Sequence, residues 1–232
     1  MFRLDALPRL ALFAGLIVLA SACAPMSTPA ATASTKIKVV ATTTQVTALA
    51  QVVGGDQIAL TGIMKAGIDP HAYEPTPLDV RAVADAQLIL ENGVGLESWL
   101  NKVIQNSGTH APVIDTSKGV QIRHGDAQEP LGDPHIWHSI PNAIIMLNNI
   151  RDSLAQIDPA HAAAYQANAA MYQQTLNELD QYIMAQVASI PAPNRKLVTN
   201  HDTLGYYADR YGLTFVGSII PSMDTSYQPS AK

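Results

Sequence analysis

The chain contains 232 residues, of which 47% are hydrophobic and 14% are charged, so it is long and apolar enough to form one large domain or two small ones. This composition excludes a chain that is disordered over most of its length. Its 19 acidic residues outnumber its 14 basic residues, and the basic residues do not cluster anywhere along the sequence. We therefore expect no nucleic-acid partner.

The N-terminal residues have the features of an export signal followed by a tether. Basic residues precede an apolar run over residues 10–19, which is too short to span a bilayer as a helix. The sequence Leu-Ala-Ser-Ala-Cys at residues 19–23 resembles a bacterial lipobox, which implies a lipoprotein signal peptide over residues 1–22 and lipidation of Cys23, the only cysteine. An ordinary signal peptide with an unrelated cysteine is the alternative. Residues 23–35 are rich in Ala, Ser, Thr and Pro, which predicts a flexible tether.

Short apolar strands alternate with helices through residues 36–158, which is typical of a parallel α/β sheet. The sequence Thr-Pro-Leu-Asp at residues 76–79 combines an N-cap residue, a proline at the first helical position and a carboxylate at the third, so it predicts a helix start. Gly54 and Gly55 predict the end of an earlier helix. We expect strands at residues 37–41, 58–61, 87–90 and 112–115, and helices at residues 45–53, 76–86 and 96–105.

Residues 159–190 predict a long helix, which follows a shorter one at residues 142–157. A helix of about 30 residues is about 45 Å long, which suits a rigid connection between two lobes. The predicted apolar stripe of this helix contains Tyr165, Ala169, Tyr172, Leu176, Leu179, Ile183, Val187 and Ile190.

Strand and helix alternate again in residues 191–232, with strands expected at residues 196–199 and 213–219 and a helix at residues 203–211. One strand–helix–strand unit leaves sheet edges and an apolar face uncovered, so we expect an incomplete C-terminal lobe. The predicted fold class is therefore α/β, with two lobes of parallel sheet flanked by helices, joined by a long helix, the second lobe truncated.

The tripeptide Asp-Pro-His occurs twice, at residues 69–71 and 133–135, although the composition predicts it only about 0.03 times in a chain of this length. Each proline restricts the backbone beside its histidine, and each aspartate could orient a neighbouring ring. His201 follows a predicted strand in the second lobe, at a place that corresponds to the loops of His71 and His135. Three imidazoles with one carboxylate suit Zn(II), and more oxygen ligands favour Mn(II). A hydrogen-bonding or exposed role for each histidine is the alternative.

The remaining histidines are weaker candidates for metal ligands. His138 lies three residues after His135 but next to a predicted helix start, so we expect it to cap that helix or to be exposed on it. We expect solvated side chains at His110, His124 and His161, and packing roles for Trp99 and Trp137.

Three segments resemble the zinc/manganese solute-binding lipoproteins of ABC importers. They are Gly-Ile-Asp-Pro-His-Ala-Tyr-Glu-Pro-Thr-Pro at residues 67–77, Asp-Pro-His-Ile-Trp at residues 133–137 and Val-Thr-Asn-His-Asp at residues 198–202. The resemblance runs from about residue 36 to residue 232. It implies two α/β lobes, a rigid connecting helix and one metal ion in the cleft between the lobes.

The resemblance also implies the ligands and the partners. His71 and His135 would bind the metal from the first lobe and His201 from the second, and a fourth ligand, a carboxylate, would lie beyond Lys232. The protein would be exported, anchored to the membrane by the lipid on Cys23, and would deliver its metal to an ABC permease without acting as an enzyme.

The choice of metal rests on two opposing features of the resemblance. A histidine at position 201 resembles the zinc-type ligand set, whereas zinc-type members often carry a His-rich loop before the second motif and this chain has only His124 there. We therefore favour Zn(II) as the transported ligand, with Mn(II) as the alternative.

Two other classes of function are considered. In an exported zinc-dependent hydrolase, the same three histidines would hold the metal, an open position would bind water, and Glu74 would act as the general base. An adhesin is the other class, but the sequence contains no repeat that supports it.

Overall fold

The computed structural model of the chain describes residues 36–125, 127 and 129–225. The predicted signal peptide, the tether and Cys23 therefore lie outside the described residues. Within the described ranges, no helix is long and apolar enough to cross a membrane.

The first lobe is built on a parallel sheet with the strand order β2-β1-β3-β4. The central strands β1 and β3 carry consecutive buried residues, as expected where helices cover both faces of a sheet. Val39 of β1 lies opposite Leu60 of β2 and Leu88 of β3. The strands are β1 (Ile37–Ala41), β2 (Ile58–Gly62), β3 (Leu88–Glu91) and β4 (Val113–Asp115).

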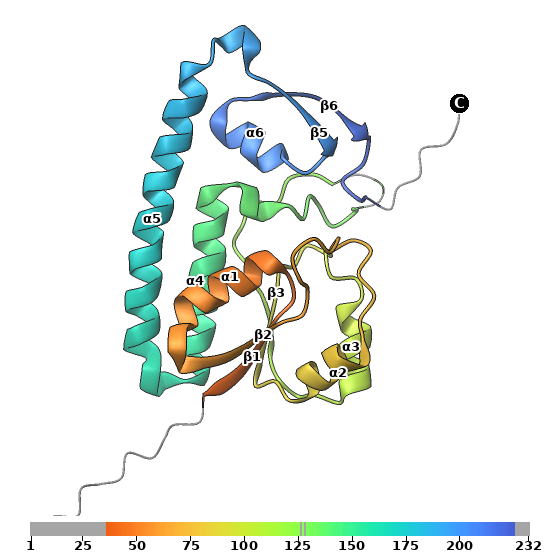
Figure 1. Cartoon of the computed structure of the whole chain (residues 1–232), viewed down its shortest axis with the longest axis vertical. Helices are drawn as coiled ribbons and strands as arrows, with labels where there is room; N and C mark the ends of the chain where they lie inside the picture. The colour runs from red at the N-terminus through yellow and green to blue at the C-terminus, as the bar shows by residue number, and fades with distance from the viewer. Residues whose placement is uncertain (1–35, 126, 128, 226–232) are drawn as a thin grey trace, which may run out of the picture. The chain divides into compact units, whose positions relative to one another are not determined.

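Helices cover both faces of this sheet (Figure 1). Because side chains alternate across a strand, Val39 belongs to one core cluster and Val40 to the other. The Val39 cluster includes residues of α1 (Thr44–Gly54), α4 (Ile140–Ile157) and α5 (Ala162–Ser189), and the Val40 cluster includes residues of α2 (Pro77–Ala84) and α3 (Leu100–Ser107). Short 3-10 helices occur at η1 (Gly55–Gln57), η2 (Ile136–His138), η3 (Pro159–His161) and η4 (Ala192–Asn194).

The local signals that the sequence contains act as predicted. The backbone N–H of Asp79 donates to Thr76 Oγ1 over 3.4 Å, and the backbone N–H of Thr76 donates to Asp79 Oδ2 over 2.7 Å, which forms a capping box at the start of α2. Gly55 ends α1 with φ at 51°, a conformation that glycine adopts readily. Both predicted helix boundaries are confirmed.

The helix predicted at residues 96–105 begins later, at Leu100. Gly93, Val94 and Gly95 all have positive φ angles, and residues 94–99 form turns. The carboxylate of Glu97 accepts hydrogen bonds from the backbone N–H groups of Asn92 and Gly93, at 2.7 and 3.2 Å. These bonds hold the turn in place of the first helical turn, so the predicted start was wrong by four residues.

The long helix α5 matches its predicted range closely, but two residues of the predicted apolar stripe, Leu179 and Ile190, are exposed. Tyr165 and Val187 of the predicted stripe are buried, whereas Leu179 is 43% exposed and its neighbour Asp180 is only 5% exposed. The carboxylate of Asp180 accepts hydrogen bonds from Arg210 and Tyr211 of α6 (Gly205–Tyr211). A polar contact therefore joins the long helix to the second lobe beside the predicted apolar stripe.

The second lobe contains β5 (Lys196–His201), α6 and β6 (Thr214–Ile220). Its two strands pair in parallel, and α6 connects them. Val198 of β5 and Ile219 of β6 are 66% and 78% exposed. Together with the first sheet and the long helix, this unit confirms the predicted α/β class.

Candidate metal centre

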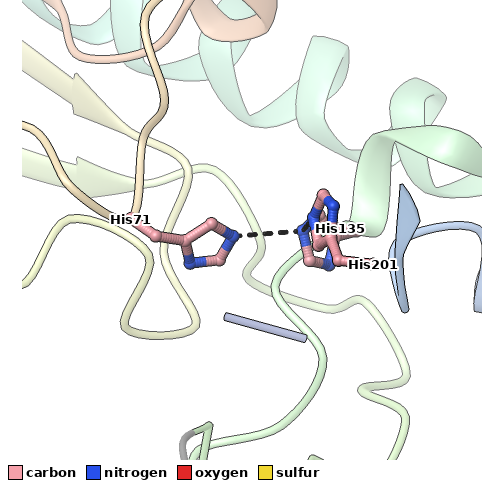
Figure 2. A group of neighbouring side chains, drawn as sticks. All are labelled: His71, His135 and His201. Carbon is pink, nitrogen blue, oxygen red and sulfur yellow. Dashed lines mark hydrogen bonds between the residues drawn. The ribbon is translucent and has the colours of Figure 1, made fainter. Parts of the chain in front are cut away.

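Three histidines that are distant in the sequence meet in one place. His71 lies in the loop between β2 and α2, His135 lies directly before η2, and His201 is the last residue of β5. The Nε2 atom of His135 lies 3.3 Å from Nε2 of His71 and 3.3 Å from Nε2 of His201. Figure 2 shows the ring of His71 turned toward the other two rings. The structure thus brings together all three of the predicted ligand residues.

The two Asp-Pro-His tripeptides fold in the same way. The backbone N–H of His71 donates to Asp69 Oδ1, and the backbone N–H of His135 donates to Asp133 Oδ1, both over 3.0 Å. Such a bond from an aspartate side chain to the backbone two residues later fixes a tight turn. Each tripeptide therefore presents its histidine from a turn that its own aspartate stabilises.

Carboxylates also fix the orientation of two of the rings. His135 Nδ1 lies 2.9 Å from Asp133 Oδ1, and His71 Nδ1 lies 3.1 Å from Glu129 Oε1. An ionised carboxylate can only accept a hydrogen bond, so Nδ1 of each ring carries the proton. The Nε2 atom of each neutral ring is then unprotonated and directs its lone pair toward the shared space, as metal-binding histidines do.

The electrostatic environment favours the neutral form of His201. Burial, followed by the charges of His135 and His71, lowers the pKa of His201 below its ordinary value. Burial alone would raise the pKa of Asp133, but hydrogen bonds from His135 and Arg123 outweigh it, so the pKa of this carboxyl is lowered and it stays ionised. A neutral imidazole is the form of histidine that binds a cation, so the lowered pKa of His201 favours metal binding.

The spacing of the three nitrogens suits a small divalent ion. Two Zn–N bonds of about 2.0–2.1 Å at a tetrahedral angle place their nitrogens about 3.3 Å apart. The histidines open into a cavity of about 320 Å³. Its other lining residues are Gln45, Gly67, Ile68, Asp69, Pro70, Trp137, Asn200, Thr203 and Thr225.

Carboxylates lie next to this centre, although the sequence analysis did not single them out. Glu129 and Asp224 form a second group with His71, in which the possible ligand atoms lie within 4.8 Å of one another. The expected fourth ligand beyond Lys232 is not among the described residues. Carboxylate oxygens thus lie near one of the three imidazoles, that of His71.

The histidines predicted to be non-ligands have mixed outcomes. His110 and His124 are exposed as expected, whereas His161 is partly buried and its Nδ1 atom lies 2.6 Å from Asp158 Oδ2. His138 is also partly buried, and burial, followed by the charge of His135, lowers its pKa to about 4. The prediction of a solvated His161 was therefore wrong, and His138 is less exposed than a helix-surface residue.

The tryptophans pack as predicted, and one of them has a second contact. Trp99 is buried in the core cluster of Val40, and Trp137 is partly buried against the other cluster. The ring of Trp137 also meets the ring of His135 edge to face, with the centroids 5.5 Å apart. Trp137 therefore forms part of the wall of the metal centre.

The sequence is similar to proteins of one known family. Residues 39–232 match the family described as zinc-uptake complex component A, periplasmic. The chain is 36% identical over 165 residues to the manganese-binding lipoprotein MntA of Halalkalibacterium halodurans, an alignment that covers 71% of this chain and 54% of MntA. It is 34% identical over 212 residues to the manganese ABC transporter substrate-binding lipoprotein PsaA of Streptococcus pneumoniae, covering 88% of this chain and 68% of PsaA.

A solved structure supports the same relationship. The periplasmic zinc binding protein TroA from Treponema pallidum superimposes with a TM-score of 0.78 at 29% sequence identity, over 85% of this chain and 71% of TroA. The chain thus spans between about half and two thirds of the length of the two curated relatives.

Proposed function

The chain belongs to the zinc-uptake complex component A family, and from that premise we propose that it captures a divalent metal ion outside the cytoplasm and delivers it to the permease of an ABC importer. The observation that carries this proposal is the convergence of three Nε2 atoms, from His71, His135 and His201, which we propose as the metal ligands. The names of PsaA, a substrate-binding lipoprotein, and TroA, a zinc binding protein, support the same class of function.

Zn(II) is the metal that this site favours, with Mn(II) as the alternative. The Nε2 atom of His135 lies 3.3 Å from the Nε2 atoms of both other histidines, a spacing that suits tetrahedral Zn(II). Mn(II) prefers more oxygen ligands than Zn(II) does, and the carboxylates of Glu129 and Asp224 lie near His71, although in a group separate from the three histidines. Both metals occur in the names of the relatives, so the ligand geometry is the better guide.

The domain organisation and membrane attachment complete the proposal. Lobes at residues 36–158 and 191–232 would bind the metal between them, and the helix at residues 159–190 would hold them together. A lipid on Cys23 would anchor the exported protein at the membrane that contains its permease. The description of MntA and PsaA as lipoproteins supports this anchor.

The zinc-dependent hydrolase is not favoured. Its proposed general base, Glu74, is exposed and does not line the cavity that contains the three histidines. A general base must reach the metal-bound water directly or through one further water. The names of the matching family and of PsaA also describe metal uptake and substrate binding, not hydrolysis.

Calorimetric titration of the full chain with Zn(II) and Mn(II) tests the proposal. We expect one tight Zn(II) site that His71→Ala removes, whereas His110→Ala, which changes an exposed loop histidine, should leave it intact. Binding that His71→Ala and His110→Ala affect equally would overturn the assignment of the site. Absence of binding by the unmodified chain would overturn the proposed function itself.

A further inference from the structure

The loop that carries His135 is held in place by residues of the second lobe. The hydroxyl of Tyr206, in α6, donates to the backbone oxygen of Asp133 over 2.9 Å. The same hydroxyl accepts a hydrogen bond from the backbone N–H of Arg123 over 2.9 Å. One side chain of α6 therefore joins two segments of the first lobe next to a metal ligand.

A chain of charged side chains runs parallel to these contacts. Asp133, which is fully buried, contacts the His135 ring through Oδ1 and Arg123 Nη1 through Oδ2, the latter over 2.7 Å. Arg123 Nε in turn donates to Asp209 Oδ2 of α6, also over 2.7 Å. Four residues, His135, Asp133, Arg123 and Asp209, thus link a metal ligand in the first lobe to a helix in the second.

The first residue of α6 leaves space for this link. A Cβ atom on Gly205 would lie 1.7 Å from Arg123 Nη1, so the guanidinium occupies the place where another residue would have its side chain. The guanidinium carbon also lies 5.6 Å from the centre of the Tyr206 ring. The position of Arg123 is therefore fixed by shape as well as by charge.

We propose that Arg123 is a positioning residue, which orients His135 for metal binding through Asp133 and couples that orientation to α6 of the second lobe. This inference rests on the proposed function, since it assigns a role at the same metal centre. Asp133 Oδ1 contacts both the backbone N–H and the ring of His135, and Arg123 holds the other carboxylate oxygen, so Arg123 helps to fix the direction of the hydrogen bond to the ring. Because α6 directly follows β5, which carries His201, the same contact also relates the positions of two ligands from different lobes.

Two substitutions break the contacts of the Arg123 guanidinium in different ways. Arg123→Gln removes both ion pairs, and Gly205→Ala moves the guanidinium aside without changing any charge. Alanine favours helices more than glycine does, so Gly205→Ala should not weaken α6 itself. Arg151→Gln is the matched control, because Arg151 contacts only Asn148 and Asp152 within α4 among the hydrogen bonds and ion pairs found in the described residues.

The full chain and each variant would be titrated with Zn(II) alone against a chromogenic chelator. We expect Arg123→Gln to weaken Zn(II) binding by up to about 10-fold, because Arg123 acts through Asp133 and loss of a direct partner of a metal ligand usually costs about 10- to 100-fold. Gly205→Ala should weaken binding in the same direction, Arg123→Lys should restore part of the loss, and Arg151→Gln should change it less than twofold.

A second readout separates positioning from a merely structural role. In the metal-free protein, nuclear magnetic resonance should show a slowly exchanging Nδ1 proton on His135, which Arg123→Gln and Gly205→Ala make faster to exchange. Affinity equal to that of Arg151→Gln, or an unchanged His135 proton in either variant, would overturn the proposal. Failure of the unmodified chain to bind Zn(II) would refute the proposed function, whereas the His135 proton would still decide the role of Arg123.

Discussion

Glu97 provides a test of how the fold supports the metal centre. This carboxyl is 6% exposed and accepts hydrogen bonds from Thr42 Oγ1 and from the backbone N–H groups of Asn92 and Gly93. Asn92 in turn donates through Nδ2 to the backbone oxygen of Pro134, next to His135. Burial raises the pKa of Glu97 from 4.5 to about 7, although its hydrogen bonds act in the opposite direction.

The raised pKa has a consequence for stability that can be estimated. Each pKa unit corresponds to about 1.4 kcal/mol, so the folded state favours protonated Glu97 by up to about 3 kcal/mol. For a carboxyl whose pKa rises on folding, this contribution is fully present below pH 4.5 and is lost as the pH rises through about 7. Glu97→Gln stays neutral at every pH. As the pH rises through that range, its free energy of unfolding should therefore increase relative to that of the wild type by up to about 3 kcal/mol.

Urea unfolding of metal-free protein between pH 4 and pH 8.5 measures this difference. Glu178→Gln, which removes an exposed carboxylate from α5, is the control, and its unfolding free energy should follow that of the wild type. A constant difference between Glu97→Gln and the wild type across the range would refute the reasoning. It would mean that Glu97 stays ionised in the folded protein and that its hydrogen bonds outweigh its burial.

Three further predictions concern the metal centre and the second lobe. Asp133→Asn should weaken Zn(II) binding by about 10- to 100-fold in a chelator competition, because the acceptor for His135 Nδ1 becomes an amide. Asp180→Ala should lower the free energy of unfolding in urea by about 1–3 kcal/mol, because it removes the acceptor for Arg210 from the long helix. The pKa of His201 is lowered, so the wild type should still bind Zn(II) more tightly than His201→Ala below pH 6.5. Zn(II) titrations at several pH values measure this difference in affinity. If the difference disappears above pH 6.5, the prediction is wrong.

Features encoded by neighbouring residues could be predicted from the sequence. The capping box at Thr76 and Asp79 depends on residues three apart, and the structure has it at the expected place. The Asp-Pro-His repeat marked two histidines because the turn it forms is local to the tripeptide. The position of His201 followed from the end of a strand, which the apolar pattern shows.

Features that depend on tertiary contacts could not be predicted in this way. Glu129 lies 58 residues from His71, and Arg123 lies 86 residues from Asp209, so no spacing in the sequence indicates either pair. The burial of Asp180 in place of Leu179 has the same origin, because its partner Arg210 comes from a helix 30 residues later. Such polar pairs become visible only in the folded protein.

The number of imidazoles bound to the metal tests the central claim most directly. X-ray absorption spectroscopy of the Zn(II)-loaded full chain should show the scattering of three imidazole rings in the first coordination shell, from His71, His135 and His201. The same measurement on His201→Ala should show two. A spectrum of the unmodified protein with one imidazole or none would contradict the proposed metal centre.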